Sequence, residues 1–253
     1  MFSRLVLALV ILAPASVDAH EFWLQPNAFV LAPESSVSVT VRIGENLEGQ
    51  PFPFDPRAYR SVVWSSPAQA VELSGLPSRA EFTGLPAYGA GLHSLTVSSF
   101  EQSLTYRDQN DLLHFLKSVG QEDLLMSAAG QGLPRKQIRE RYMRSSKVIV
   151  HFGQVTGADT RMSKGREWVA LEDGFMLFDH ERVAEEQEVQ IYCKTRNDDH
   201  PVIRQNIRTR RDGRISPDLP PNATCLLNAV FVELTGLDSD LTSDWVSLLF
   251  QTR

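Results

Sequence analysis

The chain has 253 residues, of which 42% are hydrophobic and 22% are charged, and this is the composition of a folded globular protein. Its formal net charge is −6 and no basic stripe is clustered along it, which argues against a nucleic acid as the main partner. The length suits either two small domains or one large β domain.

The first residues have the parts of a secretory signal peptide. Arg4 gives a positive start, residues 5–13 are an uninterrupted apolar run, and the small side chains of Val17 and Ala19 precede a predicted cleavage after Ala19. The apolar run is too short to span a bilayer, so we expect no stable membrane span after cleavage. We therefore predict residues 1–19 as a signal peptide and a periplasmic or secreted mature protein.

Cleavage after Ala19 makes His20 the first residue of the mature chain. Its α-amine and its imidazole can then chelate one metal ion, and two nitrogen donors suit nickel, cobalt or copper better than magnesium or calcium. The alternative interpretation is that the peptidase simply cuts there and that His20 has no role.

The next part of the chain reads as a β-sandwich with an inserted helical hairpin, over residues 20–155. Alternating side chains predict a strand within 29–43, and short strands separated by turns follow. The pattern then becomes helical, with Asp108 as a predicted N-cap and Pro134 in a predicted first turn. The further predicted strands are 59–65, 70–73, 79–82, 92–100 and 147–152, and the predicted helices are 108–119, 121–129 and 134–145.

A small, polar stretch at 156–165 predicts a linker, and a second β-sandwich is predicted over residues 166–253. The fold class expected is thus mainly β, with two β-sandwich-like domains. The predicted strands of the second domain are 188–194, 202–208, 215–219, 225–234 and 243–251.

Cys193 and Cys225 are the two cysteines of the chain, and each lies in an apolar, strand-like run. In an exported protein a disulfide is favoured over two buried free thiols, and it would stabilise the second sandwich by roughly 3 kcal/mol. Neither cysteine has histidines at the spacing of a zinc site, so we assign them no metal role.

Four stretches of the mature chain resemble one family of exported bacterial proteins, the domain-of-unknown-function family 4198. The opening HEFWLQP at 20–26 is similar to the family's AHxFWLxP motif, and residues 138–148 are similar to its RERYxRxxKxxV segment from helix to strand. Residues 208–230 resemble its RTDxDGRxxxxLP and LxAVHM motifs, and the tail at 244–250 resembles its WxSLxF strand.

This resemblance implies two β domains, the second similar to prealbumin-like sandwiches. Members are often labelled as relatives of the NikM-type periplasmic subunit of nickel and cobalt uptake systems, in which an N-terminal histidine helps to bind the metal. His20 is the position that matches that histidine. The family commonly has His-Met after the Ala-Val of its penultimate strand, whereas this chain has Phe231 and Val232. If that histidine is a second metal ligand in other members of the family, this chain lacks it.

Among the other histidines, His93 is the one that we predict as a partner of His20 at a metal, against the interpretation of a hydrogen-bonded strand histidine. The remaining histidines have no spacing that forms a metal site by itself; they are His114, His151, His180 and His200. The chain has no GxSxG, Walker or HExxH motif, so we predict no enzyme.

The sequence therefore predicts a periplasmic metal-binding or metal-delivery protein of the nickel, cobalt or copper class, partnered by a metal transporter permease or an envelope protein. The alternative is a non-metal binding or scaffold protein of the envelope with an unknown ligand. A copper oxidase built on the N-terminal histidine is a third, minor interpretation, because it needs another well-placed histidine.

Overall fold

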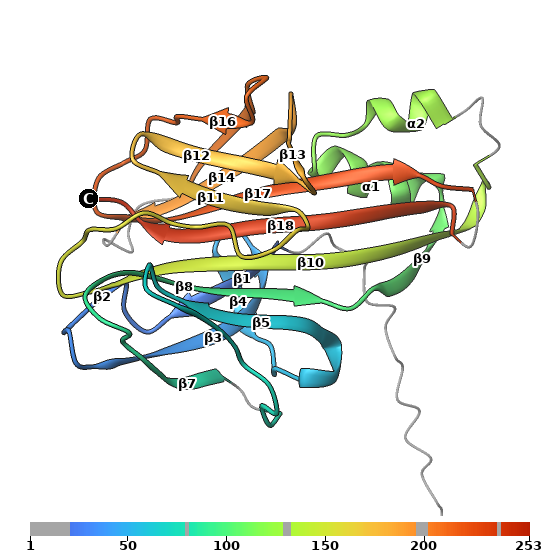
Figure 1. Cartoon of the computed structure of the whole chain (residues 1–253). Coiled ribbons are helices and arrows are strands. Elements are labelled where there is room, and N and C mark those ends of the chain that lie inside the picture. Colours follow the sequence, from blue (N-terminus) through green and yellow to red (C-terminus); the bar gives the residue numbers. More distant parts are fainter. Residues whose placement is uncertain (1–20, 79–80, 129–132, 196–201, 237–238) are drawn as a thin grey trace, which may run out of the picture.

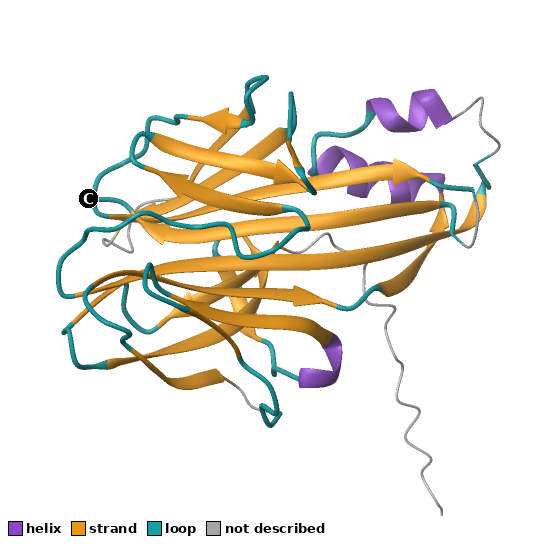
Figure 2. Ribbon diagram, in the orientation of Figure 1, coloured by secondary structure: helices purple, strands orange, loops and turns teal. Residues whose placement is uncertain are grey.

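The computed structural model describes residues 21–78, 81–128, 133–195, 202–236 and 239–253. The predicted signal peptide, its cleavage site and His20 lie outside these residues. Within them the protein is mainly β, as predicted, and its strands form three sheets (Figures 1 and 2).

The largest of these sheets has ten strands and runs through the middle of the molecule (Figure 1). Along its main path the order is β15-β14-β17-β18-β10-β8-β5-β6, and β2 and β9 also pair with β10. The bounds are β15 (Ile203–Arg208), β14 (Glu188–Thr195), β17 (Ala223–Leu234), β18 (Leu241–Gln251), β10 (Lys136–Phe152), β8 (Gly91–Ser99), β5 (Tyr59–Ser65), β6 (Ala70–Glu72), β2 (Val30–Leu31) and β9 (Gln102–Asp108).

Two smaller sheets cover opposite faces of the large one. Successive residues of β10 show this, because Val148 packs in the core under one small sheet and Ile149 packs under the other. The first small sheet contains β1 (Glu21–Pro26), β3 (Ser36–Glu45), β4 (Glu48–Pro51) and β7 (Glu81–Pro86), and the second contains β11 (Glu167–Leu171), β12 (Gly174–Asp179), β13 (Arg182–Val183) and β16 (Arg214–Ile215).

Strand β1 is fixed in the core along most of its length. Phe22, Trp23 and Leu24 are buried, and the strand pairs with β3 in an antiparallel register. The Ser247 hydroxyl on β18 donates a hydrogen bond of 2.6 Å to the carbonyl of Phe22. The chain therefore becomes rigidly held within a few residues of the predicted cleavage site.

Two of the predicted helices are present, as α1 (Gln109–Ser118) and α2 (Asp123–Ala128); a short 3-10 helix also spans Pro56–Ala58. Asp108 caps α1 as predicted, since its carboxylate accepts the backbone N–H groups of Asn110 and Asp111. The apolar side of α1 packs against Val230 and Trp245 of the large sheet.

The third predicted helix, 134–145, is wrong: residues 136–145 belong to the 17-residue strand β10. Burial alternates at its start, where Ile138 and Glu140 are buried and Arg139 is exposed. The residues have good helix propensity, but β9 pairs with one edge of this segment and β18 with the other. Pairing on both edges and burial of alternate side chains outweigh that local preference.

Pairing of β10 with β18 joins the two predicted domains in one continuous sheet. The pairing is parallel and runs from Glu140 opposite Leu241 to Val148 opposite Leu249. Strands from residues 20–155 and from residues 166–253 are therefore neighbours in the same hydrogen-bonded ladder. The division into two domains, and the prealbumin-like character of the second, remain predictions.

The predicted linker is irregular in conformation, but it packs on the large sheet. Asp159 lies in this segment and is only 8% exposed. Its carboxylate forms an ion pair with the ammonium group of Lys147 on β10. At Asp159 the segment therefore packs directly on the large sheet.

The predicted disulfide between Cys193 and Cys225 is confirmed. The two residues face each other directly in the antiparallel pair of β14 and β17. Among the described residues, no helix is long and apolar enough to cross a membrane.

Candidate functional site

Glu21, the first residue of β1, is a buried carboxylic acid directly after position 20. Its side chain accepts the backbone N–H of Asn46 at 2.9 Å and the hydroxyl of Tyr192. Asn46 can direct its N–H there because it starts a hairpin turn in which it and Leu47 both have positive φ angles. The carboxyl group is thus held in place by a side chain of β14 and by the turn between β3 and β4.

The surroundings of Glu21 change its acidity. Burial raises its pKa to about 7, while the hydrogen bonds from Tyr192 and Asn46 partly oppose this rise. The carboxyl group therefore exchanges its proton near neutral pH. It can act as an oxygen ligand when ionised, or as a proton donor when neutral.

His20 lies outside the described residues, but the peptide bond connects it to Glu21. If cleavage follows Ala19 as the sequence predicts, the amine and imidazole of His20 and the carboxylate of Glu21 would be three donors of the kinds that nickel, cobalt and copper take. Elsewhere in the described part of the chain, no three side chains of histidine, cysteine, aspartate or glutamate come together as a metal site.

His93 lies on β8 in the core, with both ring nitrogens hydrogen-bonded inside the protein. Nε2 accepts the backbone N–H of Tyr88 at 2.8 Å, so Nδ1 carries the proton and donates to the carbonyl of Gly91 at 3.1 Å. The ring also packs against Trp64 and Phe152, and burial lowers its pKa. A metal ion would have to displace one of these hydrogen bonds to reach His93.

The other described histidines are spread over the molecule. His151 on β10 has a pKa lowered to about 4, first by burial and then by the charge of Arg253. His114 is exposed on α1, and His180 is exposed beside Asp179. His200 lies outside the described residues.

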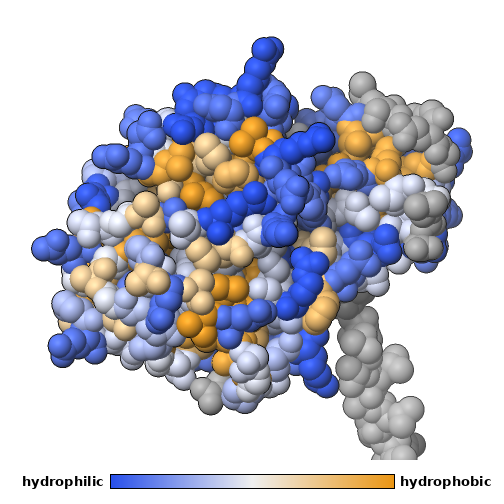
Figure 3. All heavy atoms as spheres, viewed as in Figure 1, coloured by the Kyte–Doolittle hydropathy of each residue, from blue (hydrophilic) through white to orange (hydrophobic). Residues whose placement is uncertain are grey.

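A second candidate site is a groove of about 440 Å³ on the face of the large sheet that the segment 162–166 borders. Small hydroxyl side chains form its floor: Ser61 lies opposite Ser98, and the hydroxyl of Ser98 lies 3.2 Å from that of Ser145 on the next strand. Its volume is within the range of small-molecule sites. Hydrophilic side chains are mixed with apolar ones on the side of the molecule that Figure 3 presents.

Charged groups surround one end of this groove. The Arg166 guanidinium forms ion pairs with Asp179, Glu233 and Asp244, at 2.6 to 2.7 Å, and lies over the ring of Phe231. The ring of Phe231 is thus covered by the Arg166 guanidinium.

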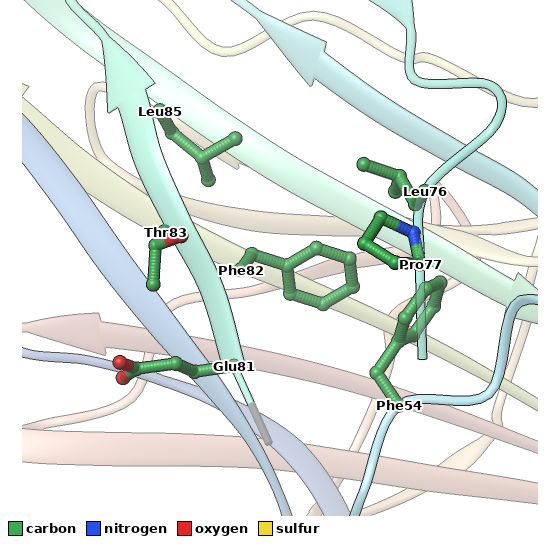
Figure 4. Close-up of a pocket in the computed structure, with 7 residues that line it drawn as sticks. All are labelled: Phe54, Leu76, Pro77, Glu81, Phe82, Thr83 and Leu85. Carbon is green, nitrogen blue, oxygen red and sulfur yellow. The ribbon is translucent and has the colours of Figure 1, made fainter. Parts of the chain in front are cut away.

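An apolar pocket of about 40 Å³ lies in the first half of the chain, between Phe54, Pro77 and Phe82 (Figure 4). The side chain of Glu81 points away from the two rings in this view. The pocket has room for little more than a water molecule, and its lining offers few polar groups to hold one. We therefore assign no ligand to it.

The sequence did not reveal the roles of Glu21 and of the buried group around Lys147. In the sequence Glu21 is noticeable only as the residue after His20, because its hydrogen-bond partners Asn46 and Tyr192 are distant along the chain. Lys147 falls in the predicted strand 147–152, but that pattern gives no partner for its charge. The position of Lys147, directly before the apolar run Val148 to Val150, is the signal that favours a buried lysine on a strand.

In a comparison with family models, residues 17–233 match the family described as "Domain of unknown function (DUF4198)". A comparison with curated proteins finds no match. Among solved structures, the chain is similar to "Crystal structure of tetra-tandem repeat in extending region of large adhesion protein", with 11% sequence identity and a TM-score of 0.21. The alignment covers 92% of this chain and 49% of that chain, so this chain spans about half of its length.

Proposed function

Since this chain belongs to the family "Domain of unknown function (DUF4198)", whose match extends over residues 17–233, we propose that it is an exported protein that binds a transition metal at its mature N-terminus. The metal is nickel, cobalt or copper. The resemblance to NikM-type periplasmic subunits of nickel and cobalt uptake belongs to the same proposal, as does a transporter permease or another envelope protein as the recipient.

The observation that carries this proposal is the buried carboxyl group of Glu21 beside position 20. The α-amine and imidazole of His20 supply two nitrogen donors, and Glu21 supplies an oxygen from the next residue. Because β1 is buried from Glu21 onward, the carboxyl group of Glu21 is held in place and loses little conformational freedom on binding. The metal ion would be held by its positive charge and by these donors, and we assign it no redox role.

Export is supported by the signal-peptide pattern together with the Cys193–Cys225 disulfide, since such bonds form and persist in oxidising compartments.

The test is calorimetric titration of the processed protein, beginning at His20, with Ni(II) and Cu(II). Two variants are compared with it: one has a Gly-Ser-Gly-Ser extension before His20, and the other is His20→Ala. We expect both to bind at least about tenfold more weakly, because each loses the amine–imidazole chelate. The matched control His114→Ala removes an exposed histidine on α1 and should bind like the unaltered protein. Equal binding by the processed and extended proteins, or no binding by the processed protein, would contradict the proposal.

The groove on the large sheet favours a second candidate function, the binding of a small polar anion. Serine hydroxyls line its floor, and the exposed cations Arg60 and Lys164 lie on its border. Titration with inorganic phosphate and with citrate tests this function. Ser145→Leu should abolish any binding by filling the floor, whereas His20→Ala should leave it unchanged. Absence of heat from both anions with the unaltered protein would refute it.

A further inference from the structure

Lys147 on β10 is a lysine with almost no access to solvent. Its side chain is 1% exposed, and its Nζ atom lies 3.1 Å and 3.3 Å from the two carboxylate oxygens of Asp159. Glu167, the first residue of β11, places its Oε1 atom 2.6 Å from the same nitrogen. A lysine and two carboxyl groups are thus enclosed together between the large sheet and the segment that crosses it.

The carboxyl group of Asp159 is polarised by backbone donors. Its Oδ1 atom accepts the N–H of Thr160 at 2.9 Å, and its Oδ2 atom accepts the N–H of Ala170 at 2.9 Å. Donors placed in this way stabilise the negative charge that develops on oxygen when a nucleophile adds to a carboxyl carbon. Burial also raises the pKa of Asp159, which favours the neutral acid over the unreactive carboxylate.

Glu167 is positioned as a base for Lys147. Its carboxylate accepts the backbone N–H of Met162 at 3.0 Å and that of Ser163 at 2.6 Å. These hydrogen bonds fix the carboxylate of Glu167 in the position where its Oε1 atom contacts the ammonium group of Lys147. Glu167 is therefore an acceptor for the protons that the nitrogen must lose before and after it attacks.

From this geometry we propose that Lys147 and Asp159 form an intramolecular isopeptide bond, with Glu167 as the proton relay. Glu167 passes one proton from the ammonium group of Lys147 to the carboxylate of Asp159, which leaves an amine and an acid. The Nζ lone pair then adds to the Cγ atom of Asp159. One carbon–oxygen bond breaks, and a second proton from nitrogen, again through Glu167, goes to the departing hydroxyl. The products are an amide and one water molecule, and no oxidant or other reactant is needed.

Two physical effects favour the amide over the ion pair. The packing of β10 against the crossing segment holds the Lys147 nitrogen 3.1 Å and 3.3 Å from the two oxygens bonded to the carbon that it attacks, so the reacting groups are already brought together. Burying the charged groups of Lys147 and Asp159 is costly, whereas the amide that they form is neutral and can keep the same backbone hydrogen-bond partners. The low access of water also slows hydrolysis of the bond once it has formed.

The test is the intact mass of the processed protein after reduction of its disulfide, compared with the mass calculated for the same N-terminus. We expect the measured mass to be lower by one water, and we expect digestion to release one branched peptide that contains both Lys147 and Asp159. The matched control Lys117→Arg, at an exposed lysine on α1, should retain the loss.

Lys147→Arg and Glu167→Gln should both have their full calculated masses, because the first lacks the nucleophile and the second cannot accept the proton. The decisive measurement is on the unaltered chain, so it does not depend on whether either variant folds. A full calculated mass for the folded, unaltered protein, with Lys147 and Asp159 in separate peptides, would overturn the proposal. Loss of water that persists in Lys147→Arg would also overturn it.

Discussion

At the scale of the residue, Glu21 makes stability depend on pH near neutrality. Its pKa is raised to about 7 in the folded protein from an ordinary value of 4.5, so the folded state binds the extra proton between these pH values. Stability contributed by this proton is complete below about pH 4.5 and is lost as the pH rises through 7. The loss is at most about 3 kcal/mol.

We therefore expect the difference in free energy of unfolding between Glu21→Gln and the unaltered protein to grow in favour of the variant from pH 5 to pH 8. Urea denaturation at each pH measures this difference. The exposed control Glu34→Gln should show a constant difference. A constant difference for Glu21→Gln would mean that Glu21 ionises as freely in the folded chain as in the unfolded one.

Single residues were predictable from the sequence where the signal is local. Asp108 is predictable as a helix cap because it is a polar residue directly before an apolar helical pattern. The disulfide is predictable because the chain has two cysteines, both in strand-like runs of an exported protein. For His93 the sequence offered a hydrogen-bonded strand histidine as an alternative, but it could not name the partners, because the N–H of Tyr88 reaches the ring only through the turn before β8. The Lys147 group was missed because Asp159 and Glu167 belong to segments that read as a linker and a new domain.

At the scale of the element, the disulfide connects two neighbouring strands across a long loop. Cys193 and Cys225 are 32 residues apart in the chain, so the bond restricts a substantial part of the unfolded ensemble. We expect the double variant Cys193→Ala/Cys225→Ala to lose about 3–4 kcal/mol of unfolding free energy.

Urea denaturation of this variant and of the unaltered protein, each with and without reductant, measures the effect. Reductant should destabilise only the unaltered protein. If the variant and the oxidised protein unfold at the same urea concentration, the bond contributes nothing beyond the packing of β14 on β17.

Strand β10 shows why elements with strong local propensity can be wrongly predicted. Arg139, Glu140 and Arg141 are good helix formers, and Pro134 precedes them as it would precede a helix. Yet Glu140 is buried and accepts hydrogen bonds from the hydroxyls of Tyr106 and Ser243, which lie on β9 and β18. These partners are distant in sequence, so a local pattern could not predict the strand.

At the scale of the whole molecule, the continuous sheet predicts that both halves unfold together. Pairing of β10 with β18 buries residues from both halves, and the two small sheets pack on opposite faces of this shared layer. In hydrogen-exchange measurements at increasing urea, the backbone amides of β8 and of β14 should therefore lose protection at the same urea concentration.

Far-ultraviolet circular dichroism should follow the same transition. Earlier loss of protection in β8 than in β14 would show that residues 20–155 and 166–253 are independently stable, as the two-domain prediction holds. The sequence predicted most strands of each half correctly. It did not predict their union, because parallel pairing between segments about a hundred residues apart has no local signal.

The position of β18 has a consequence for the order in which the chain folds. It is the last strand in sequence, yet it lies between β17 and β10 in the interior of the large sheet. Until residues 241–251 are available, β10 and β17 each have an unpaired edge, and the two halves have no common ladder. A chain threaded unfolded through a membrane from its N-terminus would thus reach its final structure only after its last strand had crossed.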